Sequence, residues 1–158
     1  MKVSLFGFDS LASKERTQLR EAMLAALGPK KRRSGELCLI LLSDKKIHEI
    51  NKQHLHHDYP TDVISFPYED AVPGTRRPPD APFGDVYIGA GVAKRQAKEI
   101  GHPLLNEFIT LAIHGTLHLV GFDDRKPADK KLMFQRQDKL VKRLLSSGKA
   151  KKKTTRSR

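Results

Sequence analysis

Residues 103–124 constrain the fold of this chain more than any other segment. Their apolar side chains lie almost all round a 3.6-residue period, which is typical of a helix enclosed by the rest of its own protein. Asn106, Glu107 and two threonines interrupt the apolar run, so the segment does not have the composition of a membrane span. The sequence therefore predicts a domain built around a central buried helix.

Two histidines stand on this helix. His114 and His118 are four residues apart and share one face, so their ring nitrogens can converge on a single ion. Gly121 can adopt a left-handed conformation and end the helix, and Asp123 and Asp124 follow at once. A carboxylate at either position could complete a His–His–Asp set with a fourth position for water, as in catalytic zinc sites.

Such an ion would activate water and stabilise charge on a carbonyl or phosphoryl oxygen, which favours metal-assisted hydrolysis. The alternative is two buried histidines that hydrogen-bond to the backbone or to nearby acids without an ion. The paired spacing, the glycine and the two acids together favour the metal site. Position 115 is Gly, so the protease pattern H-E-x-x-H is absent and the base must come from elsewhere.

The composition fits one basic domain. The chain has 158 residues and a net charge of +12, which favours partners such as nucleic acid. Residues 149–158 hold six basic and no acidic side chains, and subtracting these six leaves +6 for the rest. We expect residues 1–147 to form a single metal-hydrolase domain and residues 148–158 a disordered basic tail. With one cysteine, no signal-peptide pattern and no long apolar run, we expect a cytoplasmic protein without a membrane partner.

The remaining patterns predict four strands and about five helices. Strands are expected at residues 2–8, 36–42, 62–66 and 83–88, and helices at 10–27, 43–55, 91–100, along the central segment and from Pro127 onward. The uniformly apolar strand 36–42 should lie inside a sheet. The predicted fold class is α+β, with a small mixed four-stranded sheet covered by helices and the central helix crossing beneath it.

Residues 114–124, HGTLHLVGFDD, resemble the signature H-G-x-L-H-L-x-G-[YF]-D-H of the YbeY family, the bacterial metal-dependent endoribonucleases of rRNA maturation and ribosome quality control. Asp124 stands where the family has its third histidine ligand. A carboxylate oxygen is also a zinc ligand. The resemblance implies one Zn²⁺, held by His114, His118 and Asp124, and single-stranded RNA and the ribosome as partners.

Two further segments carry the same resemblance. Residues 83–88 are similar to the family's G-D-[LIV]-x-I strand, and residues 51–67 to its pattern N-x-x-[YF]-R-x-x-D-x-P-T-D-V-L-S-F-P. In the longer pattern Leu55 replaces a functionally important arginine, and His54 replaces the aromatic residue. Because arginine is a natural bidentate clamp for phosphate, this departure removes an expected contact.

Histidines and arginines near that position are candidate replacements. His54, His56 and His57 could donate hydrogen bonds to phosphate when protonated, or could be surface side chains that only contact water. Arg76 and Arg77 lie in a long polar stretch and are further candidate RNA contacts.

The candidate catalytic residues are His114, Asp123 and Asp85. Asp123 or Asp85 could position the attacking water, and Asp85 could instead support a ligand histidine or accept backbone hydrogen bonds. The alternative function is a ribosome- or RNA-associated binding protein whose nuclease site is weakened by the departures at Leu55 and Asp124. Metal-dependent hydrolysis of a small substrate fits the basic charge less well.

Overall fold

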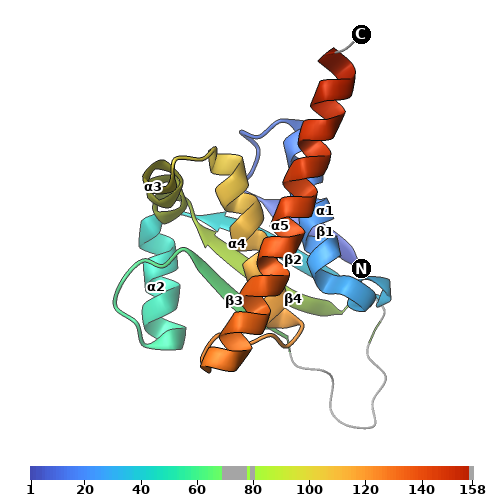
Figure 1. The fold of residues 1–158 in the computed structure, drawn as a ribbon. Coiled ribbons are helices and arrows are strands. Elements are labelled where there is room, and N and C mark those ends of the chain that lie inside the picture. Colours follow the sequence, from blue (N-terminus) through green and yellow to red (C-terminus); the bar gives the residue numbers. More distant parts are fainter. Residues whose placement is uncertain (69–77, 79–80, 157–158) are drawn as a thin grey trace.

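The structure, a computed structural model, describes residues 1–68, 78 and 81–156, with side chains described up to residue 146. The described elements run in the order β1 (Lys2–Phe6), α1 (Ser13–Leu27), the 3-10 helix η1 (Gly28–Arg32), β2 (Glu36–Leu42), α2 (Asp44–Leu55), β3 (Val63–Pro67), β4 (Pro82–Gly89), α3 (Ala90–Ile100), α4 (Leu104–Leu119) and α5 (Pro127–Arg156) (Figure 1). These elements confirm the predicted α+β domain.

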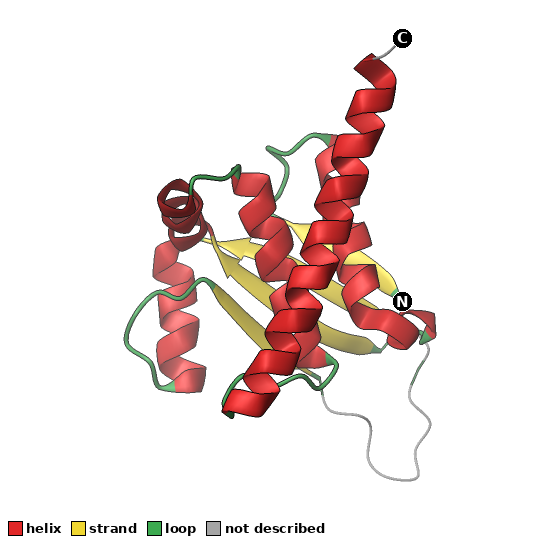
Figure 2. Cartoon of the chain, viewed as in Figure 1, coloured by secondary structure: helices red, strands yellow, loops and turns green. Residues whose placement is uncertain are grey.

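The sheet has the strand order β1-β2-β4-β3. Strands β1, β2 and β4 are parallel, and β3 pairs antiparallel with β4. Strand β2 is interior, as its apolar sequence predicts, and its Leu37 and Leu39 are fully buried. Figure 2 shows α1, α4 and α5 across one face of the sheet, with α2 and α3 to one side.

Helix α4 is the centre of the domain. It contacts α1, α3 and α5 as well as β3 and β4, and its apolar residues from Phe108 to Leu117 are buried on nearly all sides. Gly115 lets the helix lie close to the sheet, because a Cβ built there would be 2.5 Å from Val86 Cγ1 and 3.0 Å from Ser65 Oγ. The Ser65 hydroxyl donates a 2.8 Å hydrogen bond to the Gly115 carbonyl at this contact.

Several boundaries differ from the predicted ones. Strand β1 ends at Phe6, before the expected residue 8, because Gly7 turns the chain with a φ of 87°. The 3-10 helix η1 (Gly28–Arg32) was not among the expected elements. Ser43 is the N-cap of α2, and its side chain accepts a hydrogen bond from the Lys46 N–H. Helix α5 extends to Arg156, and the division at residue 147 stays a prediction. Across the described ranges, no helix combines the length and the hydropathy needed to cross a bilayer.

The contact at Gly115 generates a stability prediction. Gly115→Ala should lower the free energy of unfolding by roughly 1–3 kcal/mol, because the added methyl overpacks the helix–sheet contact. Urea denaturation of the variant and the parent measures the loss. In a Val86→Ala background the same substitution should cost less, since the nearest clashing atom is gone. An equal cost in both backgrounds would contradict this explanation.

Candidate metal centre

Three side chains meet at the C-terminal end of α4. His114 and His118 lie one helical turn apart, and their Nε2 atoms are 3.1 Å from each other. Asp124 Oδ2 lies 3.7 Å from His114 Nε2 and 3.5 Å from His118 Nε2. The three candidate ligand atoms are all within 4.8 Å of one another, so one ion could contact all of them.

The turn after α4 brings the aspartate to the histidines. Gly121 has a φ of 105°, which favours glycine because a side chain is strained there. Its N–H donates to the His118 carbonyl at 3.1 Å, and the Phe122 N–H donates to the Leu117 carbonyl at 3.0 Å. These bonds fold the chain back within three residues and place Asp124 beside the helix it has just left.

Hydrogen bonds on the far side of each ring orient the two imidazoles. His118 Nδ1 donates to the Phe122 carbonyl at 3.1 Å, since a carbonyl can only accept. His114 Nδ1 lies 2.7 Å from Gln137 Oε1, and donates to that amide oxygen. Both rings then carry their proton on Nδ1, and both Nε2 lone pairs face the same point. Two lone pairs and a carboxylate oxygen at this spacing fit a cation with nitrogen and oxygen ligands.

Burial favours the neutral form of one of these rings. The pKa of His114 is lowered from its ordinary value of 6.5, chiefly because the ring is desolvated, while the hydrogen bond with Gln137 acts in the opposite direction. His114 therefore stays neutral near pH 7, which is the state that metal ligation requires.

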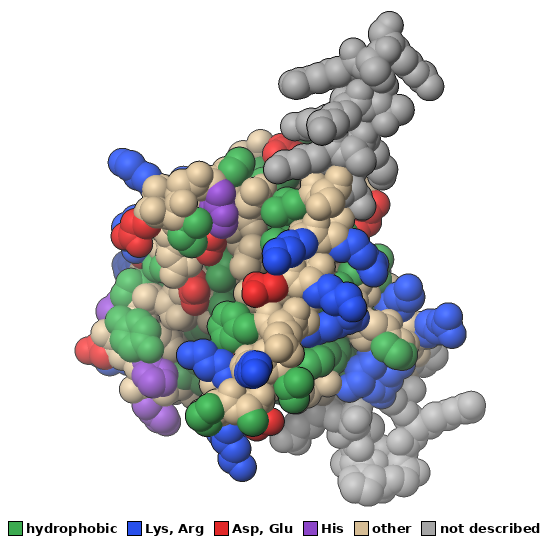
Figure 3. All heavy atoms as spheres, viewed as in Figure 1, with side chains coloured by type: hydrophobic (Ala, Val, Ile, Leu, Met, Phe, Trp, Pro, Cys, Tyr) green, Lys and Arg blue, Asp and Glu red, His purple; other side chains and the backbone are tan. Residues whose placement is uncertain are grey.

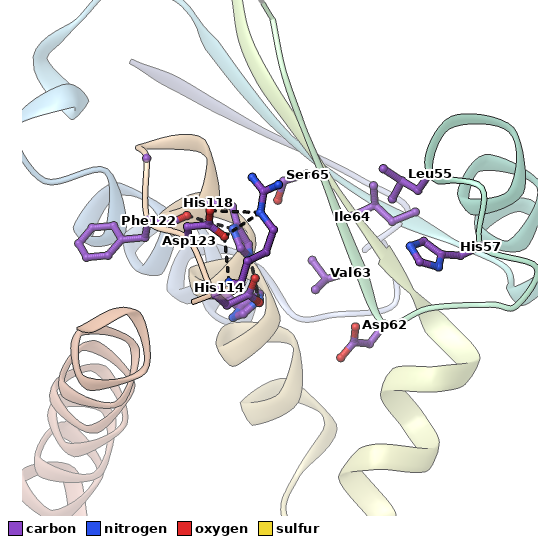
Figure 4. Close-up of a pocket in the computed structure, with 13 residues that line it drawn as sticks. Leu55, His57, Asp62, Val63, Ile64, Ser65, His114, His118, Phe122 and Asp123 are labelled. Atoms are coloured by element: carbon purple, nitrogen blue, oxygen red, sulfur yellow. Dashed lines mark hydrogen bonds and ion pairs between the residues drawn. The ribbon is translucent and has the colours of Figure 1, made fainter. Parts of the chain in front are cut away.

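The group lies in a cleft of about 830 Å³. In Figure 4 the histidine pair, Phe122 and Asp123 occupy one side of this cleft, and Leu55 and His57 lie on the other. Ile64, Val63 and Ser65 of strand β3 lie between these two sides. The cleft is therefore formed jointly by the end of α4, the turn after it, β3 and the end of α2.

The structure separates the two neighbouring aspartates. Asp124 faces the histidines, whereas Asp123 accepts hydrogen bonds from the backbone N–H of Arg125 at 3.0 Å and from its Nε at 3.2 and 3.3 Å. The backbone N–H and the guanidinium of Arg125 lower the pKa of Asp123. Asp123 thus lines the cleft as a carboxylate that is paired with the guanidinium of Arg125.

Asp85 lies elsewhere. Val86 faces α4, because it is the side chain that a Cβ at Gly115 would meet, so the preceding Asp85 points to the opposite face of the sheet. There its Oδ2 accepts hydrogen bonds from the hydroxyls of Tyr68, at 2.7 Å, and Tyr87, at 3.2 Å. The structure does not bring Asp85 to the two histidines.

Of the candidate RNA-contacting residues that the structure describes, only one lines the cleft. His54, His56 and His57 are exposed, but of these only His57 lines it. The His54 ring packs edge-on against Phe66, with ring centroids 5.5 Å apart. Arg76 and Arg77 lie outside the described residues. Leu55 lines the cleft and is 43% exposed.

Two residues of the site were not among those predicted. Gln137 is only 7% exposed on α5, and the sequence signal for it was a lone amide in the helical stripe between Met133 and Leu140. Asp62 lines the cleft, and its Oδ2 accepts a 3.2 Å hydrogen bond from Gln96 Nε2. No spacing in the sequence relates Asp62 to the histidines, because the contact depends on how β3 lies against α4.

The fold and the site define a class: a single α+β domain with a His–His–Asp group, capable of binding a metal, in an open cleft. The family model for endoribonuclease YbeY matches residues 6–145. The chain belongs to the YbeY family.

Relatives named endoribonuclease YbeY cover most of the chain. The relative from Elusimicrobium minutum is 42% identical over 117 residues, which are 74% of this chain and 80% of the relative. The Bacillus pumilus relative is 38% identical over 136 residues, 82% and 86% of the two chains. The solution structure of a Thermotoga maritima protein matches with a TM-score of 0.61 and 26% identity, covering 94% of this chain and 93% of that one.

The buried ring of His114 generates a pH prediction. Its pKa in the folded chain lies below its unfolded value, so between these two values the unfolded chain binds more protons and the free energy of unfolding rises with pH. With EDTA present, stability from urea denaturation should therefore fall as the pH drops below about 6.5 and level off below the folded-state pKa. His114→Gln should remove part of this dependence and His56→Gln should not. A parent curve that is flat from about pH 7.5 to about pH 5 would contradict the prediction.

Proposed function

We propose that this chain is a metal-dependent endoribonuclease that cuts single-stranded RNA. The observation that carries the proposal is the convergence of two Nε2 lone pairs and one carboxylate in an open cleft, in a chain whose relatives are named endoribonucleases. Two nitrogen ligands, one oxygen ligand and room for water favour zinc. A bound Zn²⁺ would supply a Lewis acid that lowers the pKa of water and offsets charge on a phosphoryl oxygen.

In this proposal the protein's own groups hold, orient and accept protons. His114, His118 and Asp124 hold the ion, while Gln137 and the Phe122 carbonyl fix the two rings. A proton must leave the nucleophilic oxygen. Asp62 is the candidate acceptor, since of the three carboxylates that line the cleft it belongs neither to the His–His–Asp group nor to the pair with Arg125. This replaces Asp85 and Asp123 in that role.

The basic surface supports RNA as the substrate. Figure 3 shows Lys and Arg side chains gathered along and beside α5. Up to residue 146, where the described side chains of this helix end, the exposed ones are Lys130, Lys131, Lys139, Lys142 and Arg143. Cations spread over a surface attract the phosphates of any sequence. We propose rRNA on the ribosome, in the cytoplasm, as the biological substrate. Residues 1–147 would carry the activity and the basic residues 148–158 would strengthen phosphate contact.

A second function is favoured by one specific observation. Leu55, an exposed leucine, stands in the cleft at the position of the family's arginine, and Asp124 adds negative charge where a neutral histidine is expected. A cleft with less positive charge would stabilise a phosphorane-like transition state less. The chain would then bind RNA or the ribosome with little cleavage.

Metal analysis and an RNA cleavage assay test the proposed function. Protein purified without chelator should hold roughly one zinc per chain and cut single-stranded RNA in preference to duplex. His114→Ala should lose the metal and lower the cleavage rate by about 100-fold or more, because a ligand is gone. His48→Ala, a histidine outside the cleft, is the matched control. If His114→Ala cuts RNA as fast as the parent, the enzyme proposal is wrong.

Variants at Asp124 distinguish the two functions. Asp124→Ala should weaken metal binding and Asp124→His should keep it, if the carboxylate is the third ligand. Metal and cleavage in the parent support the nuclease. A parent without metal or cleavage, together with an Asp124→His variant that gains both, would favour the binding protein.

A further inference from the structure

Among the residues that the structure describes, a single permanent cation lines the cleft. Among the described residues that line it, Arg125 is the only Lys or Arg, and it shares the cleft with Asp62, Asp123 and Asp124. Without a bound ion, the three carboxylates repel an incoming phosphate, since like charges at short range raise its free energy. Asp62 and Asp123 are not among the candidate ligands of the ion, so an anionic substrate is still favoured by the charge that Arg125 supplies when the ion is in place.

Asp123 accepts hydrogen bonds from the Nε of the Arg125 guanidinium. The Arg125 Nε donates to both carboxylate oxygens, at 3.2 and 3.3 Å, and its backbone N–H donates to Oδ1 at 3.0 Å. In the described part of the chain, no partner is found for the two Nη groups of Arg125. Because the guanidinium is a planar fork, a contact through Nε leaves the Nη donors available for two oxygens of one phosphate.

Within the described ranges, the opposite wall of the cleft has no Lys or Arg side chain. Figure 4 shows Leu55 and His57 across the cleft from Asp123 and the histidines, and Leu55 can make no hydrogen bond with a phosphate. His57 is exposed and can donate from a charged ring only when protonated. Within the described lining of the cleft, the permanent positive charge therefore comes from Arg125, in the turn after α4.

We propose that Arg125 is the residue that binds an RNA phosphate in this cleft, and that Asp123 is a positioning residue that orients Arg125 by its Nε. The proposal rests on the endoribonuclease function and deepens it, because it names the group that recognises the substrate. It also assigns Asp123 a role other than activating water.

We expect side-chain substitutions in the Asp123–Arg125 pair to leave the fold intact. The Arg125 side chain is 86% exposed and Asp123 39%, and exposed ion pairs contribute little to stability. Substitutions here should therefore leave the thermal unfolding midpoint and the metal content close to those of the parent. This separates loss of phosphate binding from loss of structure.

The experiment compares Arg125→Gln with Lys126→Gln, which removes the same charge from the adjacent, exposed residue outside the cleft lining. Cleavage of a single-stranded RNA oligonucleotide gives kcat/KM, and fluorescence anisotropy with EDTA present gives binding. Arg125→Gln should lower both by roughly tenfold or more, as expected for a charged hydrogen bond to phosphate. It should also reduce the slope of log K against log salt by about 0.7, the value for one lost contact on a single strand.

Two further variants test the arrangement. Asp123→Asn should weaken RNA binding although it removes a negative charge, since the guanidinium loses its anchor; tighter binding would overturn the positioning role. Leu55→Arg in the Arg125→Gln background should restore part of the binding, because it supplies an equal charge from the opposite wall. Equal behaviour of Arg125→Gln and Lys126→Gln would overturn the phosphate contact.

Failure of the proposed function is visible separately. If the parent does not cut RNA, the nuclease proposal is wrong. The RNA binding measured by fluorescence anisotropy then tests the Arg125 contact by itself. A selective loss of binding in Arg125→Gln supports the contact even then. If the parent cuts RNA and Arg125→Gln cuts it equally well, the nuclease stands and the contact is wrong.

Discussion

The structure depends on the close approach of α4 to the sheet. This helix is apolar on nearly all sides, so it must be enclosed, yet its last two turns carry imidazoles that must reach a cleft. Gly115 allows both, because a helix without a Cβ at this position can contact Val86 and Ser65 of the sheet directly. The neighbouring His114 then contacts Gln137 of α5, with 16% of its side chain still exposed.

The chemistry of the site depends on groups that are not ligands. The Phe122 carbonyl on the returning chain and the Gln137 amide oxygen on α5 each accept a hydrogen bond from the Nδ1 of one ring. Both Nε2 lone pairs consequently face one point beside a carboxylate, an arrangement that is unfavourable without a cation and favourable with one. The same hydrogen bonds restrain the rings before any ion arrives, which lowers the entropy lost on binding.

The charge of the cleft distinguishes this chain from the pattern of its family. Leu55 removes a cation from one wall and Asp124 adds an anion near the histidines. Arg125 stands one residue after Asp124 and is oriented by Asp123, so the turn that adds negative charge also adds a positive group. Apart from a bound ion, the permanent positive charge in the described lining of the cleft therefore depends on the geometry of three consecutive residues.

Local periodicity in the sequence was enough to predict much of this molecule. The elements and the meeting of His114 with His118 follow from repeats of two or 3.6 residues, which the backbone imposes by itself. The interior position of β2 follows from its uniformly apolar sequence. Tertiary structure alone decided which of the adjacent aspartates faces the histidines, that Asp85 points to the other face of the sheet, and that Gln137 and Asp62 belong to the site. Alternation along β4 predicts that Asp85 and Val86 face opposite ways, but only the packing of α4 decides which of those faces is the buried one. Contacts such as that of His114 with Gln137, 23 residues away, depend on how α5 crosses α4, and no local repeat in the chain specifies that crossing.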